Sequence, residues 1–283
     1  MSRRWPRGLL LLMAVSSLLA AAAPLSAAPL LEELDYQMDA WVLRDAARAK
    51  LTLKNLGAGR YQAVLSGETR GLAALLSGQR RDSYQTEMVF ADGKLKPLIY
   101  REETRRRGQR HLKEYRFNHA AQRLELWQLK ERQGHLVLKW HTELKEPVYD
   151  PLSAFYNCRL GLLGPLKEGD TLQIAGIPYT APETLEVRLG ANTAAGRQVM
   201  VTLSNPALAG QKGLIFIIFN GDLVPTQGWT RVLGFGKISG TLLPDGKYLK
   251  NGLPDIPSGL KVPESGDLRR ARAWAGGFFG RAP

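Results

Sequence analysis

The sequence has a single cysteine, Cys158, and this scarcity excludes two features that are common in secreted proteins. One cysteine cannot form an internal disulfide bond, and no cysteine lies near the amino terminus to carry a lipid anchor. A reactive thiol needs a neighbouring base and a lowered pKa, and the sequence around Cys158 indicates neither. We therefore interpret Cys158 as a small buried side chain and not as a nucleophile.

The sequence also lacks the short motifs that mark common catalytic sites. It contains no G-x-S-x-G, no H-E-x-x-H and no phosphate-binding loop. Its four histidines are not spaced with acidic residues in a way that would assemble the several ligands of a metal site. These absences favour a protein that is not an enzyme and that carries no metal or other cofactor.

Long apolar runs are scarce, and the longest lies within residues 1–28. Arginines come first, a leucine- and alanine-rich stretch follows, and small residues end the segment, which is the layout of a secretory signal peptide. A membrane span needs about 20 apolar residues, and this run is shorter. We expect residues 1–28 to direct export to the periplasm. The alternative is an uncleaved anchor, although no stop-transfer pattern follows.

Acidic residues are outnumbered, 26 against 39 lysines and arginines, which gives a formal net charge of +13. A basic chain favours polyanionic partners. Export makes a nucleic acid an unsuitable partner, so we expect a lipid or another anionic component of the envelope, with peripheral contact to a membrane. The alternative is that the surplus charge only keeps the surface solvated.

Strict alternation of apolar and polar residues dominates the rest of the chain. Leu51 and Leu53 point to one face of a strand, while Lys50 and Thr52 point to the other. The same period of two recurs in runs such as RYQAVLSG, SYQTEMVFADG and TLEVRLG, which are separated by turn-forming Gly, Asn and Asp residues. The pattern predicts an all-β fold, mainly an antiparallel meander that closes as a barrel or half-barrel.

Two apolar segments depart from this alternation. Residues 213–219 are apolar on both faces, which indicates either a central strand or a strand with one face on an apolar cavity. Residues 70–78 are small and apolar, and we expect a short helix that plugs the end of the barrel or forms a flap over a pocket. If a ligand cavity exists, its expected lining is Leu72, Leu75, Leu76, Ile215, Ile217 and Phe219.

A short central helix is predicted over residues 151–160. Asp150 is a good N-cap, because its carboxylate can accept hydrogen bonds from the free N–H groups of the first turn. Pro151 suits the first helical position, and Gly161 suits the end. The helix should pack Leu152, Phe155 and Tyr156 against the sheet, with Ser153 and Asn157 elsewhere.

The mature chain divides into one β domain and a tail. The β domain, residues 29–250, has two sub-parts (29–147 and 165–250) that the helix joins. Residues 251–283 read as a Pro/Gly-rich linker followed by a basic and aromatic end, which suits an anionic membrane surface, although a disordered end is the alternative. The residues expected to contact anions are Arg105, Arg106, Arg107 and Arg110 in a hairpin and Arg269, Arg270 and Arg272 in the tail. For the hairpin, the alternative is a charged edge that resists unwanted strand pairing.

One segment carries a family resemblance. YDPLSAFYNCR, followed by a Gly169–Asp170 pair before a strand, resembles the pattern of the bacterial envelope family called domain of unknown function 3108. The resemblance covers about residues 33–245 and departs at the arginine-rich hairpin 101–116 and beyond residue 250. It implies secretion and an all-β fold with a helix. It implies no activity, so no catalytic residue can be assigned from it.

Two hypotheses for function follow. The first is a binding or carrier module that holds an apolar, lipid-like ligand of the envelope. The second is a structural or interaction protein of envelope assembly with a filled core. A continuous internal cavity lined by apolar side chains would favour the first, and a filled core would favour the second.

Overall fold

The computed structural model describes residues 28–130, 134–164, 167–177, 183–202, 213–232, 236–249 and 252–253. The predicted signal peptide, apart from Ala28, and the predicted tail, apart from Gly252 and Leu253, lie outside the described residues.

Fourteen described strands form one sheet, and two helices accompany it. The first eight strands are β1 (Leu30–Ala40), β2 (Leu43–Gly57), β3 (Arg60–Thr69), β4 (Arg81–Ala91), β5 (Lys94–Arg106), β6 (Gln109–Asn118), β7 (Arg123–Lys130) and β8 (His135–Glu143). The remaining strands are β9 (Thr171–Gly176), β10 (Glu183–Thr193), β11 (Gly196–Thr202), β12 (Leu214–Phe219), β13 (Pro225–Val232) and β14 (Gly236–Leu242). The helices are α2 (Gly71–Ser77) and α3 (Pro151–Arg159).

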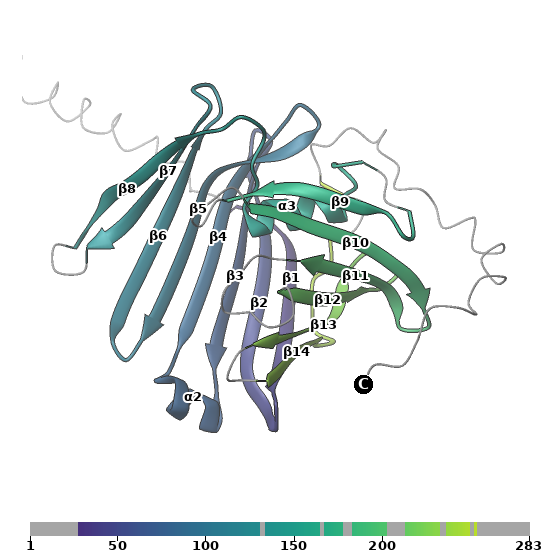
Figure 1. Ribbon diagram of the computed structural model, residues 1–283. Coiled ribbons are helices and arrows are strands. Elements are labelled where there is room, and N and C mark those ends of the chain that lie inside the picture. The colour runs from purple at the N-terminus through teal and green to yellow at the C-terminus, as the bar shows by residue number, and fades with distance from the viewer. Residues whose placement is uncertain are drawn as a thin grey trace, which may run out of the picture.

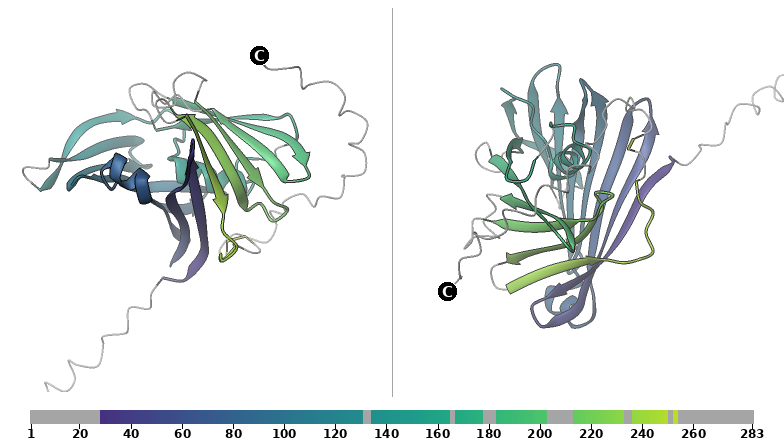
Figure 2. Two further views of the ribbon diagram at one scale, coloured as in Figure 1. Left: turned by 90° about the horizontal axis from the view of Figure 1, so that it is seen from below. Right: turned by 90° about the vertical axis from the view of Figure 1, so that its right-hand side faces the viewer.

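The sheet consists of two antiparallel meanders that join through β1 and β14. Its strand order is β8-β7-β6-β5-β4-β3-β2-β1-β14-β13-β12-β11-β10-β9. The chain therefore runs outward from β1 to β8, crosses over through α3, and returns inward from β9 to β14 (Figure 1). The two sub-parts expected from the sequence share this one sheet. β8 and β9 are its two edges, so the described strands curl around α3 without closing a hydrogen-bonded ring (Figure 2).

The alternation in the sequence sets which face of each strand is buried. Leu51 lies opposite Leu34 on β1 and Leu65 on β3, so these residues share one face. Leu51 and Leu53 are buried in the main core with Leu34, and we call this face, on which α3 packs, the inner face. The predicted all-β, mainly antiparallel fold with one short central helix and a second small helix is confirmed.

The predicted central helix begins and ends as its sequence indicates. The Oδ1 atom of Asp150 accepts hydrogen bonds from the backbone N–H groups of Leu152 (2.9 Å) and Ser153 (3.1 Å). At the other end, Gly161 has a positive φ of 67°, and the N–H of Leu162 bonds to the carbonyl of Asn157. This is a Schellman ending, which favours glycine because a side chain strains that backbone conformation.

The polar face of α3 is buried as well, which the sequence pattern does not predict. Leu152 and Tyr156 enter the main core, and Phe155 stacks on Phe219 with 6.3 Å between ring centroids. Ser153 and Asn157, however, are also fully buried. Helical periodicity suggests that such residues face solvent, but α3 crosses the inner face of a curled sheet and has strands on several sides.

Asn157 and the N-cap residue Asp150 bind α3 to two strands, whereas the hydroxyl of Ser153 bonds to the carbonyl of Asp150. Asn157 accepts a hydrogen bond from the N–H of Leu95 (2.9 Å) and donates one to the carbonyl of the same residue (2.8 Å). The hydroxyl of Thr86 donates to Asp150 (2.9 Å). The helix is thus fixed to β5 by an amide and to β4 by its own N-cap, and these groups are satisfied as buried polar groups must be.

A buried ion pair ties α3 to the first strand. The guanidinium of Arg159 lies 2.6 Å from the carboxylate of Glu32, and both side chains are almost fully buried. The same carboxylate accepts hydrogen bonds from the hydroxyl of Tyr156 (3.0 Å) and the backbone N–H of Leu249 (3.2 Å). Burial, followed by the charge of Glu32, raises the pKa of Tyr156 well above its usual value, so the phenol keeps the proton that it donates.

Removing one partner of this ion pair should destabilise the protein strongly. Replacing Arg159 with Met leaves the Glu32 carboxylate buried and uncompensated, which typically costs about 3–5 kcal/mol of unfolding free energy. Urea unfolding measures the change. Arg60→Met is the control, because it breaks an exposed pair with Glu87 that is worth at most about 1 kcal/mol. Adding Glu32→Leu to Arg159→Met should recover part of the loss, and equal losses in the test and control variants would contradict the interpretation.

The cap residue should make stability depend on pH. Burial raises the pKa of Asp150 above its ordinary value of 3.8 in spite of its hydrogen bonds. The folded state then holds the proton more tightly than the unfolded state, so this group's contribution to stability falls as pH rises above that value. Asp150→Asn keeps a cap and cannot ionise. The unfolding free energy of the natural protein minus that of Asp150→Asn should therefore decrease with rising pH, whereas a constant difference would contradict the pKa direction.

Asp150→Ala gives the matched measurement of the cap itself. It removes the acceptor for two N–H groups and the partner of Thr86, so it should lower the unfolding free energy by about 1–2 kcal/mol. Asp150→Asn should cost less at every pH. A loss as large in Asn as in Ala would show that the charge, and not the cap, is what the site requires.

Candidate functional site

The inner face of the second meander is apolar on four of its strands, β10, β11, β12 and β14, and β13 contributes a threonine to the same row. Val187 of β10 lies opposite Val201 of β11, which lies opposite Ile215 of β12. The row continues through Thr230 of β13 to Ile238 of β14. Residues directly opposite one another in antiparallel strands project to the same face, so these side chains form one surface.

Helix α3 covers only part of this surface. Val187 is buried with Leu185, Ile174 and Ala154 in a cluster that includes α3. Val201 and Ile215 are only partly buried, although their side chains are wholly apolar. The sheet therefore presents an apolar inner surface that is stopped by α3 at one end and left partly exposed farther along. This surface is the candidate binding site.

The six residues expected to line a cavity do not come together. Ile215 and Ile217 share the inner face of β12, and Phe219 packs against Phe155 of α3. The three leucines are elsewhere: α2 packs on β2 and β3 and lies at the far end of the first meander (Figure 1). Leu72, Leu75 and Leu76 are 57%, 73% and 67% exposed.

The expectation that the segment 70–78 plugs the barrel is therefore wrong. Helix α2 buries none of its residues, because its alanines, and not its leucines, face the strands. Leu72, Leu75 and Leu76 follow the spacing i, i+3, i+4 and occupy one helical face, but that face points away from the sheet. Apolar periodicity shows which residues share one face of a helix. It does not show whether that face contacts the sheet or the solvent.

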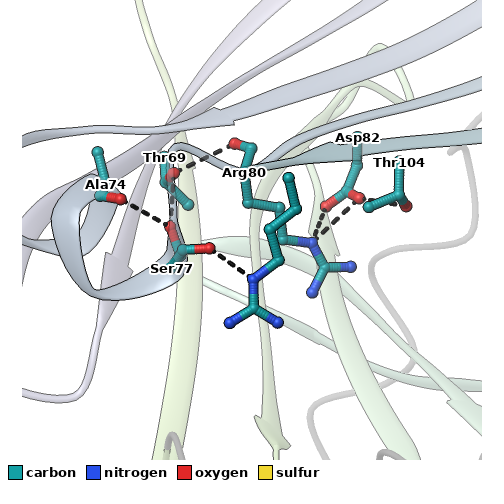
Figure 3. A network of polar contacts seen from close by, with 7 residues as sticks. Thr69, Ala74, Ser77, Arg80, Asp82 and Thr104 are labelled. Atoms are coloured by element: carbon teal, nitrogen blue, oxygen red, sulfur yellow. Dashed lines mark hydrogen bonds and ion pairs between the residues drawn. The ribbon is translucent and has the colours of Figure 1, made fainter. Parts of the chain in front are cut away.

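Polar contacts fix α2 to the strand ends. The hydroxyls of Ser77 and Thr69 lie 2.9 Å apart, and Thr69 also reaches the carbonyl of Arg80 (3.1 Å) (Figure 3). Beside them, Asp82 binds the guanidinium of Arg80 (2.8 Å) and the hydroxyl of Thr104 (2.7 Å). Arg106 donates to the carbonyl of Ser77 (2.8 Å), which joins α2 to the β5–β6 hairpin.

The arginines expected to contact anions gather near α2 where the structure describes them. Arg105, Arg106, Arg107 and Arg110 are all exposed at the end of the β5–β6 hairpin. Two of them, Arg105 and Arg110, share the carboxylate of Glu103 at 2.5 and 2.9 Å. The other three predicted anion contacts, Arg269, Arg270 and Arg272, lie outside the described residues.

A separate groove of about 720 Å³ runs over the outer face of β1–β5. Ser66 and Ser83 lie opposite each other in its floor, with Lys50 and Glu103 next in the same row. Its charges are mixed and paired: Lys50, for example, lies 2.9 Å from Glu33. The groove is therefore a polar surface that has little surplus charge for a ligand.

The described residues offer little for catalysis. They contain no group of three or more His, Cys, Asp or Glu side chains placed to hold a metal ion. The hydrogen-bond partner of His119 is a backbone carbonyl, that of Pro97. Burial raises the pKa of the Cys158 thiol to about 12, so almost none of it is thiolate near neutral pH. Among the same residues, no helix has the length and apolar character needed to cross a membrane.

Sequence reasoning missed three residues that the structure places in notable positions. Trp41 and Val42, in the β1–β2 turn, are 79% and 70% exposed. Their only sequence signal is that two large apolar residues are adjacent. Glu32, the buried acid beneath α3, reads in the sequence as an ordinary strand carboxylate.

Comparison with known proteins places the chain in a family. The family described as "Protein of unknown function (DUF3108)" matches residues 35–192, more than half of the chain, so the chain belongs to this family. The match ends within β10, whereas the resemblance read from the sequence runs to about residue 245.

A similar solved structure is a beta-barrel-like protein of domain of unknown function DUF1849 from Brucella abortus. It has 12% sequence identity and a TM-score of 0.46, and the match covers 77% of this chain and 98% of that chain. Comparison with curated proteins gives no match.

The raised pKa of Cys158 predicts an unreactive thiol. A chromogenic thiol reagent should label the folded protein very slowly near neutral pH and label it completely in urea, where burial is lost. The assay is clean because the chain has one cysteine, and Cys158→Ser supplies the blank. Rapid stoichiometric labelling of the folded protein would reopen the nucleophile interpretation.

Proposed function

We propose that the protein is an exported, non-catalytic periplasmic protein that binds an apolar, lipid-like ligand of the cell envelope on the inner face of β10–β14. One observation carries the proposal: this face is apolar on β10, β11, β12 and β14 and is only partly covered by α3. Apolar surface of this size is costly to leave in water, and concave apolar surfaces with few polar groups are the usual places where such ligands bind.

The proposed location rests on the sequence of residues 1–28, whose basic, apolar and small-residue regions suit a signal peptide. An exported protein with a basic surface meets anionic lipids and saccharides more often than nucleic acids. The absence of a catalytic role is proposed from the chemistry of the described residues. Their nucleophile candidate, Cys158, is partly buried, and burial raises the pKa of its thiol to about 12. The polar residues near it, such as Asn157 and Ser153, are occupied in holding α3.

A second candidate function is supported by the filled region around α3. There, two apolar clusters and the Glu32–Arg159 pair bury six of the nine residues of the helix. In this second function the protein binds no ligand and acts as a structural or interaction module of the envelope. The two functions differ in whether the inner face of β11 and β12 binds an apolar molecule.

Val201 and Met200 allow a matched test of this face. They are adjacent in β11 and both partly buried, but their side chains lie on opposite faces of the strand. Val201→Gln places an amide on the inner face, and an amide without partners in an apolar contact costs about 1–3 kcal/mol. The affinity for a fluorescent long-chain fatty acid should therefore fall by about tenfold or more in Val201→Gln. Met200→Gln, on the outer face, should leave it unchanged.

Native mass spectrometry of protein taken from its own envelope complements this titration. We expect a co-purified lipid-sized mass on the natural protein and on Met200→Gln, with less on Val201→Gln. Thermal unfolding checks that both variants fold. No lipid mass and no fatty-acid binding by the natural protein would overturn the carrier function and favour the structural alternative.

A further inference from the structure

We propose that the end of the molecule formed by α2, the β1–β2 turn and the β5–β6 turn docks on an anionic phospholipid surface. In this contact Leu72, Leu75, Leu76, Trp41 and Val42 enter the interfacial region, and the surrounding arginines bind lipid phosphates. We call this region the docking end. It uses side chains other than those of the inner face of β10–β14, although the N–H of Trp41 donates to the carbonyl of Lys237 in β14 (2.8 Å). Docking therefore does not require that this face hold a ligand.

The exposed apolar residues are concentrated at the docking end. Seven large apolar side chains are exposed in the part of the chain that the structure describes, and five of them belong to α2 and the β1–β2 turn. The other two, Leu56 and Leu138, are each about 40% exposed and lie apart from it. A concentrated set of strongly exposed apolar residues marks a contact surface, whereas scattered ones do not.

These two elements project from the same end of the sheet. Ala47 of β2 pairs with Thr69, the last residue of β3, and α2 starts just beyond it. The N–H of Arg70 also bonds to the carbonyl of Ala46. The β1–β2 hairpin continues past this point to its turn at Trp41, and Figure 1 shows α2 and this hairpin at the same lower end.

The chain holds α2 in place with polar contacts and so keeps its leucines outward. Ser77 and Thr69 join through their hydroxyls (Figure 3). The carbonyl of Ser77 also accepts a hydrogen bond from Arg106. The carbonyl of Gly78 accepts one from the N–H of Arg107 (3.0 Å). The last carbonyls of the helix are thereby satisfied by the arginine-bearing hairpin, which couples the apolar helix to the basic turn beside it.

Trp41 has a strained backbone conformation, and its side chain is exposed to solvent. Its φ is 51°, in the left-handed region, and the two-residue turn that it begins usually takes glycine there. A bulky residue at such a φ is unfavourable, yet the indole is 79% exposed and forms little of the core. Strain kept without a packing benefit points to a role in contact with something outside the fold.

The charges around the apolar residues match an anionic bilayer. The segments 68–82 and 103–110 contain seven arginines, all exposed, against three acids, Glu68, Asp82 and Glu103, a surplus of four positive charges. Asp39, Arg44 and Asp45 at the β1–β2 turn lower this surplus to three. Arg106 and Arg107 are placed by backbone contacts and have no carboxylate partner in the described ranges. The guanidinium fork binds phosphate through paired hydrogen bonds, and leucine and tryptophan favour the layer just beneath the headgroups.

Vesicle binding of the mature full chain tests the docking end. The natural protein should co-sediment with phosphatidylglycerol/phosphatidylethanolamine vesicles and much less with phosphatidylcholine vesicles, and added salt should weaken binding. Replacing Leu72, Leu75 and Leu76 with Gln should reduce the affinity at least about tenfold, since three leucine side chains lose their burial. Leu56→Gln with Leu138→Gln is the matched control and should bind as the natural protein does.

Two further variants separate the apolar from the electrostatic contribution. Arg81→Gln with Arg105→Gln should weaken binding to anionic vesicles and reduce its dependence on salt, whereas Arg60→Gln, outside the docking end, should not. Acyl chains labelled with bromine should quench tryptophan fluorescence, and the quenching should decrease in Trp41→Phe. Both results together place the arginines at the headgroups and the indole beneath them.

Trp41→Gly distinguishes a docking residue from a structural one. Glycine accepts a positive φ, so this variant should melt at the same temperature as the natural protein or higher, while its vesicle affinity falls. A fall in both would mean that Trp41 only stabilises the turn.

Three outcomes would overturn the proposal: no vesicle binding by the natural protein, equal binding to neutral and anionic vesicles, or unchanged binding in the leucine variant. Absence of vesicle binding together with a stoichiometric complex with another envelope protein would assign the same surface to a protein partner. Because the fatty-acid titration with Val201→Gln uses different residues, failure of docking and failure of ligand binding are separately visible.

Discussion

The ion pair between Glu32 and Arg159 is the constraint on which the arrangement of the two halves depends. It joins the first described strand to the end of the crossover helix, across 127 residues of sequence. A charged pair without water is tolerated only where its remaining hydrogen-bonding groups are satisfied. Tyr156 and the backbone of Leu249 supply two of those bonds. The pair therefore positions α3, β1 and the segment after β14 together.

The position of α3 in turn divides the inner face into a filled part and an accessible part. Near α3, Phe155 and Tyr156 meet side chains from both meanders, so the interior is packed. Farther along β11 and β12, Val201 and Ile215 stay partly exposed, although Val201 packs against the cluster that includes α3. The curled sheet is packed around the helix at one end, and its partly exposed remainder is where we propose that a ligand binds.

The family pattern around Asp150 acquires a structural meaning from these contacts. Its Asp, Asn and Arg positions bind β4, β5 and β1 in turn. Polar residues that fix a helix at three places specify a unique arrangement that apolar packing alone would leave less defined. The pattern therefore identifies residues that fix the helix in the fold. The resemblance itself implies no activity.

The sequence by itself determined the features that depend on near neighbours. Alternation predicted the strands because each residue of a strand turns its side chain to the opposite face from the last, and Asp150, Pro151 and Gly161 predicted the limits of α3 because caps act within one turn. Only the tertiary structure decided the rest. The burial of Asn157, the partner of Glu32 and the outward direction of the α2 leucines all depend on which distant strands surround a residue. That environment is set by the curl of the sheet around α3, and no local pattern encodes it.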